Sequence, residues 1–263
     1  MRIAYIVLTC EKYISSRVPW QLQTMFSSIE RNDIYFLGHT VDPSRRLFSW
    51  GAEDSYEQLP SKFIDFFKHT DLDYDWFILI DDDTYVFTDR LAAFLSLQSP
   101  HDSFAVGQLL DHLRDTYCGV YLSGGAGTVI SRMLYHQLRV YVRTAPSSMV
   151  SCHWCADICL GMWIKQVCGV LIHHPDFHAD VYNPSKDDIK KSITFHHLKE
   201  WKDYEDMLCK KWDDVWRLIL TFLRTFSLLV FCELFLKKFF FANFFAHFFA
   251  NFFLKSSILR TFF

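Results

Sequence analysis

Three adjacent carboxylates carry the clearest chemical signal in this sequence. Asp81, Asp82 and Asp83 come directly after the apolar run 76–80, which predicts a strand buried on both faces. Because three neighbouring carboxylates repel one another, a bound cation is the simplest way to hold them together. Carboxylate oxygens suit Mg²⁺ or Mn²⁺, and either ion can also bind phosphate oxygens. The alternative interpretation is a solvated acidic turn that caps a helix.

Two later segments add further candidate chemistry. The run 123–127 reads Ser-Gly-Gly-Ala-Gly, and its three glycines would let the backbone approach a ligand closely. Such a run is also typical of an ordinary turn. Asp157 stands at the start of the apolar helix predicted for 157–167. It is interpreted either as a helix cap or as a general base.

Histidines and cysteines offer other ligands. His196 and His197 follow the short apolar segment 193–195, and His196 could complete a metal site near the acids. A second histidine group, which could compete for that role, consists of His173, His174 and His178. The spacing Cys152-x₂-Cys155-x₃-Cys159 permits zinc, but no second pair stands at zinc-ribbon spacing. Disulfide or core cysteines are the preferred interpretation.

The order of predicted strands and helices along the chain indicates an α/β sheet that would position these residues. Short apolar runs alternate with segments of helical spacing. The predicted strands are 3–8, 34–37, 76–80, 170–173 and 193–196, and the predicted helices are 17–29, 59–68, 157–167 and 200–216. Ligands of open α/β sheets bind beyond the carboxyl ends of strands, where the acid triplet stands. No Pro/Ser/Gly-rich linker interrupts 1–216, which predicts one domain there.

The segment 217–263 differs from this domain in composition. More than half of the 27 phenylalanines follow Arg217, and 240–253 repeats with a period of four. Three interpretations remain open: a membrane-associated tail, a mistaken gene model or translated repeat, and a packed part of the domain. The run 3–8 is too short for a transmembrane helix and has no signal-peptide cleavage site after it, so it is interpreted as a strand.

Bulk charge and cysteine content narrow the classes of partner and compartment. The net charge of −3 gives no basic field, so nucleic acid is not an expected partner. The 8 cysteines fit a secretory-pathway protein with disulfides, although free buried cysteines in the cytosol would also fit.

Taken in order, these motifs resemble glycosyltransferase family 31, the Fringe-like β1,3-glycosyltransferases, over residues 3 to 216. The matching segments are 53–62 (Glu-Asp-Ser-Tyr-Glu-Gln-Leu-Pro-Ser-Lys), 76–86 with the acid triplet, 123–127 with Ser131-Arg132, Asp157-x₃-Gly161, and Thr194-Phe195-His196 with Tyr204. The last segment is most similar to core-1 galactosyltransferases. Ala156 departs from the pattern, because many family members carry a second acid there.

The resemblance implies a GT-A fold, in which a nucleotide-binding α/β half adjoins an acceptor-binding half. It implies inverting transfer of a hexose or N-acetylhexosamine from a UDP-sugar to a glycan or glycoprotein, with Mn²⁺ or alternatively Mg²⁺. By position, the implied roles are Asp83, Asp81 and His196 for the metal, Thr9, Lys62, Asp81, Asp82, Gly124 and Gly125 for the donor, and Asp157 as catalytic base. A lumenal location at the Golgi or endoplasmic reticulum membrane is also implied, although the family's amino-terminal anchor is not recognisable.

Two other functions remain open at this point. A catalytically inactive member would bind sugar or nucleotide without transfer, and loss of the acid at 157 would favour it. A metal-dependent nucleotidyltransferase or phosphatase could use the same triplet, but it would not need the glycine run or the Asp157 motif. A purely membrane-structural role for the tail is disfavoured by the intact acid triplet.

Overall fold

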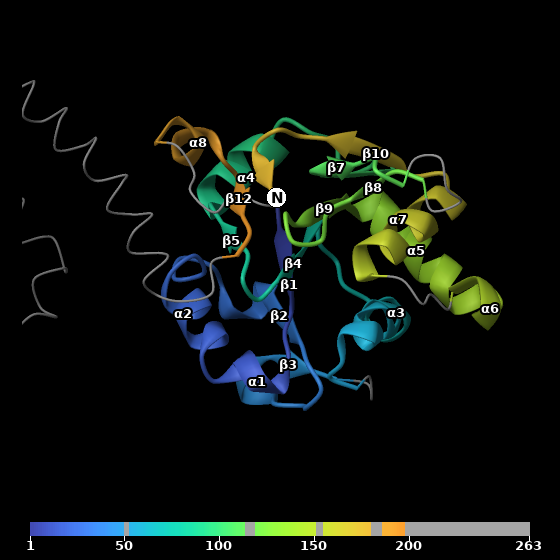
Figure 1. The fold of residues 1–263 in the computed structure, drawn as a ribbon, viewed down its shortest axis with the longest axis horizontal. Helices are drawn as coiled ribbons and strands as arrows, with labels where there is room; N and C mark the ends of the chain where they lie inside the picture. The colour runs from blue at the N-terminus through green and yellow to red at the C-terminus, as the bar shows by residue number, and fades with distance from the viewer. Residues whose placement is uncertain (50–52, 114–118, 151–154, 180–185, 198–263) are drawn as a thin grey trace, which may run out of the picture. The chain divides into compact units, whose positions relative to one another are not determined.

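A mixed seven-stranded sheet forms the centre of the described structure (Figure 1). This computed structural model describes residues 1–49, 53–113, 119–150, 155–179 and 186–197. In spatial order the strands are β10 (Val170–His173), β6 (Phe104–Gly107), β9 (Thr128–Ser131), β4 (Trp76–Asp81), β1 (Ile3–Leu8), β2 (Ile34–Leu37) and β3 (Leu47–Phe48). β9 runs antiparallel to both of its neighbours, and the other neighbouring pairs are parallel.

The two central strands explain where the acid triplet stands. β1 and β4 are apolar along almost their whole length, because both of their faces are covered. Their parallel register pairs Ile3 with Trp76 at one end and Leu8 with Asp81 at the other. The residues that follow, Thr9 and Asp82, therefore leave the sheet side by side at its carboxyl edge.

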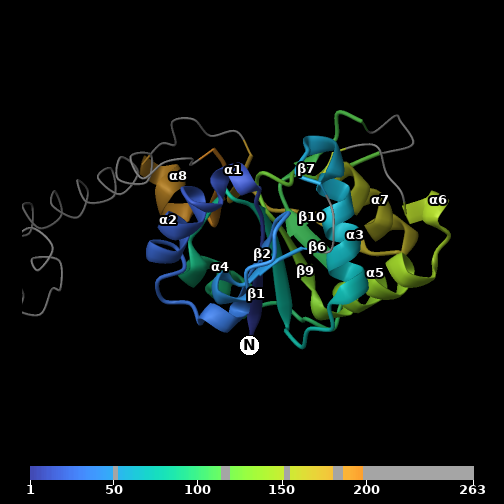
Figure 2. The same ribbon diagram turned by 90° about the horizontal axis from the view of Figure 1, so that it is seen from below.

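Helices cover both faces of the sheet (Figure 2). One face carries α1 (Glu11–Ile14), α2 (Arg17–Gln23) and α4 (Thr88–Leu95), and the other carries α3 (Leu59–His69), α5 (Arg132–Thr144) and α7 (Ala156–Gln166). Side chains alternate along β1, so Tyr5 and Val7 join the first core and Ile6 and Leu8 the second. The shorter helices are α6 (Ser147–Val150), α8 (Lys186–Lys191), η1 (Arg31–Asp33), η2 (Pro43–Arg45) and η3 (Tyr56–Gln58).

Two small sheets complete the described part and bring distant segments to the acid triplet. One contains β11 (Phe177–His178), β12 (Thr194–Phe195) and β5 (Tyr85–Val86), and the other pairs β7 (Leu109–Leu110) with β8 (Tyr121–Leu122). β5 follows the triplet directly and pairs antiparallel with β12, matching Tyr85 to Phe195. His196, the next residue along the chain, is thereby carried to the acids.

The α/β class predicted from the sequence is confirmed, and so are the strands at 3–8, 34–37 and 170–173. The helix predicted for 17–29 is too long, since α2 ends at Gln23 and Thr24 leaves helical geometry with ψ at −96°. The threonine hydroxyl there donates to the carbonyl of Trp20 at 2.6 Å, which helps to turn the chain. β10 lies at the edge of the sheet, and most of its side chains are exposed.

The predictions for the carboxyl-terminal part lie outside the described residues. They are the helix 200–216, the boundary at residue 216, the tail 217–263 and Tyr204 of the late motif. In the part of the chain that the structure describes, no helix has the length and hydrophobicity needed to cross a membrane.

Candidate functional site

One cavity collects every site residue that the sequence predicted. Its volume is about 670 Å³, and it opens at the carboxyl ends of β1 and β4. The predicted residues that line it are Thr9, Lys62, Asp81, Asp82, Asp83, Gly124, Gly125, Asp157 and His196. They come from strand ends, from α3, from the glycine run and from the start of α7, which are far apart in the sequence.

Asp82 is held by the protein itself. Only 5% exposed, it forms an ion pair with Arg17 and accepts a hydrogen bond from the Thr9 hydroxyl at 2.8 Å. Its carbonyl accepts from the Gln21 amide at 3.1 Å. Burial raises the pKa of the Asp82 carboxyl, although the Arg17 charge opposes this. These contacts occupy both carboxylate oxygens, so the donor contact predicted for Asp82 stays a prediction.

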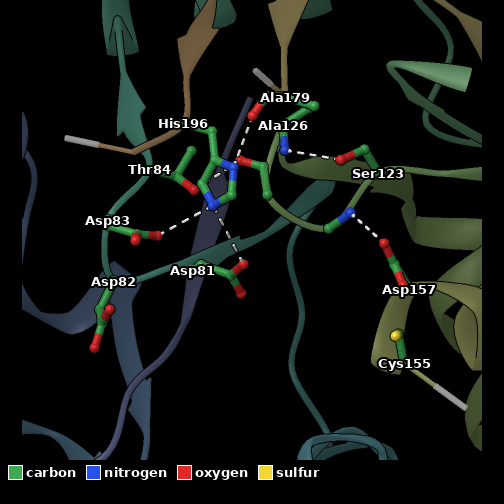
Figure 3. Close-up of polar contacts among 12 residues, drawn as sticks. Asp81, Asp82, Asp83, Thr84, Ser123, Ala126, Cys155, Asp157, Ala179 and His196 are labelled. Carbon is green, nitrogen blue, oxygen red and sulfur yellow. Dashed lines mark hydrogen bonds and ion pairs between the residues drawn. The ribbon is translucent and has the colours of Figure 1, made fainter. Parts of the chain in front are cut away.

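Asp83 and Asp81 instead face His196 (Figure 3). The imidazole Nε2 lies 3.2 Å from Asp83 Oδ1 and 3.9 Å from Asp81 Oδ2. His196 Nδ1 donates to the carbonyl of Ala179 at 2.7 Å, which fixes the ring with Nε2 toward the acids. Loss of solvation and the neighbouring charge of Asp83 raise the pKa of Asp81, although the nearby His196 opposes this shift. Two carboxylates and an oriented imidazole are a donor set that suits Mn²⁺.

His197 is a further candidate ligand that the sequence did not single out. Ligand atoms of Asp83, His196 and His197 all lie within 4.8 Å of one another. The His197 ring stacks on that of His196 with centroids 3.7 Å apart. An extended segment would send the two side chains to opposite sides, but His197 has a left-handed φ of 66°. That turn is not readable from the spacing of the residues.

The glycine run forms the wall against which His196 packs. A Cβ on Gly125 would lie 2.3 Å from His196 Cε1, so a side chain at this position would displace the ring. Threonines on both sides hold the run in place. Thr84 donates to the Gly125 carbonyl at 2.8 Å, and Thr194 donates to the Ala126 carbonyl at 2.6 Å. The close approach expected of this backbone is therefore an approach to an imidazole of the same chain.

Asp157 lies on the other side of the glycine run (Figure 3). Its Oδ2 accepts from the Gly124 N–H at 3.2 Å, and its Oδ1 accepts from the Ile158 N–H at 2.8 Å. Burial raises the pKa of Asp157, although these N–H donors oppose the shift. The N-cap residue of α7 is Cys155, but Asp157 in the first turn accepts from the Ile158 N–H, so the capping and general-base interpretations both remain open.

Lys62 and Thr9 line the cavity but are engaged with the protein. The Lys62 ammonium, 2% exposed, donates to the Thr9 carbonyl at 2.8 Å and to Asp54 Oδ1 at 2.7 Å. Asp54 also accepts from the Glu11 N–H at 2.5 Å. Lys62 therefore ties the end of β1 to the segment that contains Asp54, and its charge is shared with that carboxylate.

The three histidines of the second group, His173, His174 and His178, make contacts outside the cavity. His178 Nε2 lies 2.8 Å from the Ser192 hydroxyl, and its ring stacks on Phe195. His173 Nδ1 accepts from the Leu109 N–H at 3.2 Å. His174 packs edge-on against Phe94. None of the three lines the cavity, so the structure favours His196 over this group.

The cysteine cluster shows no zinc-like arrangement within the described residues. Cys159 is disulfide-bonded, in line with the preferred interpretation. Cys155 is a free thiol in the cavity wall, where it accepts a hydrogen bond from the Tyr56 hydroxyl at 3.3 Å. Cys152 lies outside the described residues.

Comparison with known proteins identifies the family of this chain. A profile described as Fringe-like matches residues 2–215, which is most of the chain. The chain belongs to the Fringe-like family. The family resemblance read from the motifs is thus confirmed. The GT-A type of α/β fold that this resemblance implies is confirmed with it.

Individual relatives are distant. A beta-1,3-glucosyltransferase of Mus musculus is 26% identical over 203 residues, which are 74% of this chain and 40% of that protein. Chondroitin sulfate synthase 2 of Mus musculus is 38% identical over 107 residues, 39% of this chain and 13% of that protein. The chain thus spans 40% or less of the length of these two relatives. Among solved structures, galactosyltransferase LgtC with donor and acceptor sugar analogs has a TM-score of 0.49 at 12% identity, covering 80% of this chain and 95% of that one.

Proposed function

We propose that this chain is an inverting, metal-dependent glycosyltransferase that forms β1,3 linkages. It would move a hexose or N-acetylhexosamine from a UDP-sugar to a hydroxyl of a glycan or glycoprotein. One observation carries the proposal. Asp83 with His196, and Asp157, face a single cavity from the two sides of the glycine run. Family membership supports the same reaction class.

Asp83 and His196 would hold the cation, with Asp81 and His197 within reach. The cation, when bound, neutralises the charge that develops on the departing diphosphate. The protein's own contribution is to keep the ligands oriented. Ala179 fixes the imidazole, and the glycine run supports the ring from behind.

Asp157 would act as the general base. Its carboxylate takes the proton of the acceptor hydroxyl while that oxygen forms the new bond to the anomeric carbon and the bond to UDP breaks. A single displacement of this kind inverts the anomeric centre. The two N–H donors orient the carboxylate, and burial raises its pKa toward that of a more effective base.

The disulfide at Cys159 supports a compartment for this reaction. Disulfides persist in oxidising surroundings such as the secretory pathway. We therefore propose the lumen of the Golgi or endoplasmic reticulum as the place of action. An inactive family member is the weaker candidate, because the acid at position 157 is present and oriented toward the cavity.

A donor panel tests this function. The full chain is incubated with Mn²⁺ and UDP-galactose, UDP-glucose, UDP-N-acetylglucosamine or a nucleoside triphosphate, with and without simple glycoside acceptors. We expect UDP release from one UDP-sugar, and transfer with inversion seen by NMR of the product. Release of pyrophosphate from the triphosphate alone would instead identify a nucleotidyltransferase.

A further inference from the structure

Arg17 is a buried cation inside the acidic site that no sequence motif had suggested. It is the first residue of α2, is 8% exposed, and lines the same cavity. Its guanidinium lies 3.6 Å above the Tyr13 ring, which restricts its position. The sequence signal that could have found it is its place in the chain. The chain that leaves a central strand stays at first beside the carboxyl edge, where the acids stand, and Arg17 comes nine residues after the end of β1.

The guanidinium divides the acid triplet into two parts. Arg17 Nη1 pairs with Asp82 Oδ1 and lies 3.6 Å from Asp83 Oδ2. The other oxygen of Asp83 lies 3.2 Å from His196. Asp83 is therefore held between an arginine on one side and an imidazole on the other. One turn along α2, Gln21 donates to the carbonyl of Asp82, so the same helix grips this residue twice.

We propose that Arg17 is a positioning residue of the cation site, which engages Asp82 and holds Asp83 with one oxygen toward His196. This inference rests on the proposed function, because the cation is the one that Asp83 and His196 are proposed to bind. Asp82 then serves as the counter-ion of Arg17 rather than as a metal ligand. Asp81 and Asp83 remain as the carboxylates directed at the cation.

The direction of the change in cation affinity on removal of Arg17 separates a positioning role from a purely electrostatic one. A nearby positive charge repels a divalent cation, so removing an arginine that acts only as a charge tightens cation binding. Removing an arginine that orients the ligands weakens it, and loss of such outer-shell partners typically costs roughly 10- to 100-fold in metal affinity.

The chain offers a matched control in Arg2. This arginine also pairs with an aspartate, Asp33 at 3.2 Å, and also lies over a tyrosine ring, Tyr74 at 4.2 Å. It stands just before β1, at the opposite end of that strand from the cavity, and does not line it. Arg2→Met thus removes the same kind of contact without touching the site.

The test is calorimetric titration of Mn²⁺ into the full chain without donor or acceptor, for the wild type, Arg17→Met and Arg2→Met. We expect the Kd for Mn²⁺ to rise roughly 10- to 100-fold in Arg17→Met and to stay within about twofold of wild type in Arg2→Met. The absorption spectrum of Co²⁺ at the same site, which reports ligand geometry, should change in the first variant and not in the second.

A double variant controls for loss of folding. Because Arg17→Met leaves Asp82 buried without its partner, the double variant Arg17→Met/Asp82→Asn removes the pair together, and near-ultraviolet circular dichroism in chelator reports its fold. Weakened Mn²⁺ binding in this folded variant is also expected. Unchanged or tighter binding in a folded variant would overturn the role of Arg17 alone. A wild-type chain that binds no Mn²⁺ would instead contradict the proposed metal site itself.

Discussion

At the scale of single residues, Gly124 and Gly125 separate the two halves of the site. A Cβ on Gly125 would collide with the His196 ring at 2.3 Å, whereas a Cβ on Gly124 would press on Asp157 Cβ at 3.2 Å. The first contact cannot be accommodated without moving the ring. The second is tight but can relax by a few tenths of an ångström. Gly125→Ala therefore tests the proposed metal ligand His196, and Gly124→Ala tests the proposed base Asp157.

We expect Gly125→Ala to weaken Mn²⁺ binding, because it displaces the proposed imidazole ligand. We expect Gly124→Ala to leave Mn²⁺ binding nearly unchanged and to lower kcat, because it shifts the proposed base. Calorimetry and steady-state kinetics on the two variants measure both effects. Equal loss of Mn²⁺ affinity in both would show that the glycine run acts as one structural unit.

For Asp157→Asn we expect retained UDP binding and transfer reduced by about 10²-fold or more, as is typical for loss of a general base. The amide keeps an oxygen for only one of the two N–H donors, and it cannot take the acceptor proton. Asp89→Asn is the matched control, since Asp89 is an exposed acid in the first turn of α4. A near wild-type transfer rate in Asp157→Asn would reduce that residue to a structural role.

At the scale of elements, the segment that carries His196 is held by α4. Arg90 in this helix donates to the carbonyls of Ile189 and Ser192, the latter at 2.8 Å, and its guanidinium lies 4.0 Å from the Phe87 ring centre. The Phe87 N–H also donates to the carbonyl of Ile193 at 2.9 Å. Arg90 of α4 and the adjoining Phe87 thereby hold the segment 189–193, which leads to His196.

Arg90→Met should therefore lower both the stability and the Mn²⁺ affinity of the chain. Loss of the charged donor should cost about 2 kcal/mol of the free energy of unfolding. Arg143→Met is the control, since Arg143 likewise donates to a backbone carbonyl, that of Lys68, at a distance from the cavity. It should affect stability without changing the Kd for Mn²⁺. The same loss of Mn²⁺ affinity in both variants would argue against this positioning by α4.

The elements also show how much the sequence can predict. The strands and the acid triplet were readable because a continuous apolar run that ends in acids is a local pattern, as in 76–83. Arg17 was not recognised, since its partner Asp82 is 65 positions away and only the parallel pairing of β1 with β4 brings them together. The position of His197 beside Asp83 and His196 depends on a left-handed backbone turn that its spacing does not encode.

At the scale of the whole molecule, we propose that residues 1–216 form the catalytic domain. The Fringe-like match ends at residue 215, close to the point where the composition changes. A tail this rich in phenylalanine would present more apolar surface than a soluble monomer normally tolerates. It would therefore contact a membrane or promote aggregation rather than contribute to the site.

We expect a chain truncated after Trp216 to fold and to bind UDP. Thermal unfolding with and without UDP and Mn²⁺ measures this, and UDP should raise the Tm of the truncated chain and of the full chain alike. A truncated chain that is unfolded, or folded but insensitive to UDP, would mean that the tail belongs to the domain and that the boundary is wrong.

We propose that a cation held by Asp83 and His196 drives transfer from a UDP-sugar. The most direct test is UDP release from the preferred UDP-sugar by the full chain and by Asp83→Asn, each with Mn²⁺ and with excess chelator. We expect release only by the wild type with Mn²⁺, and we expect Asp83→Asn to fall to the level seen in chelator. Undiminished release in chelator, or by Asp83→Asn, would contradict it.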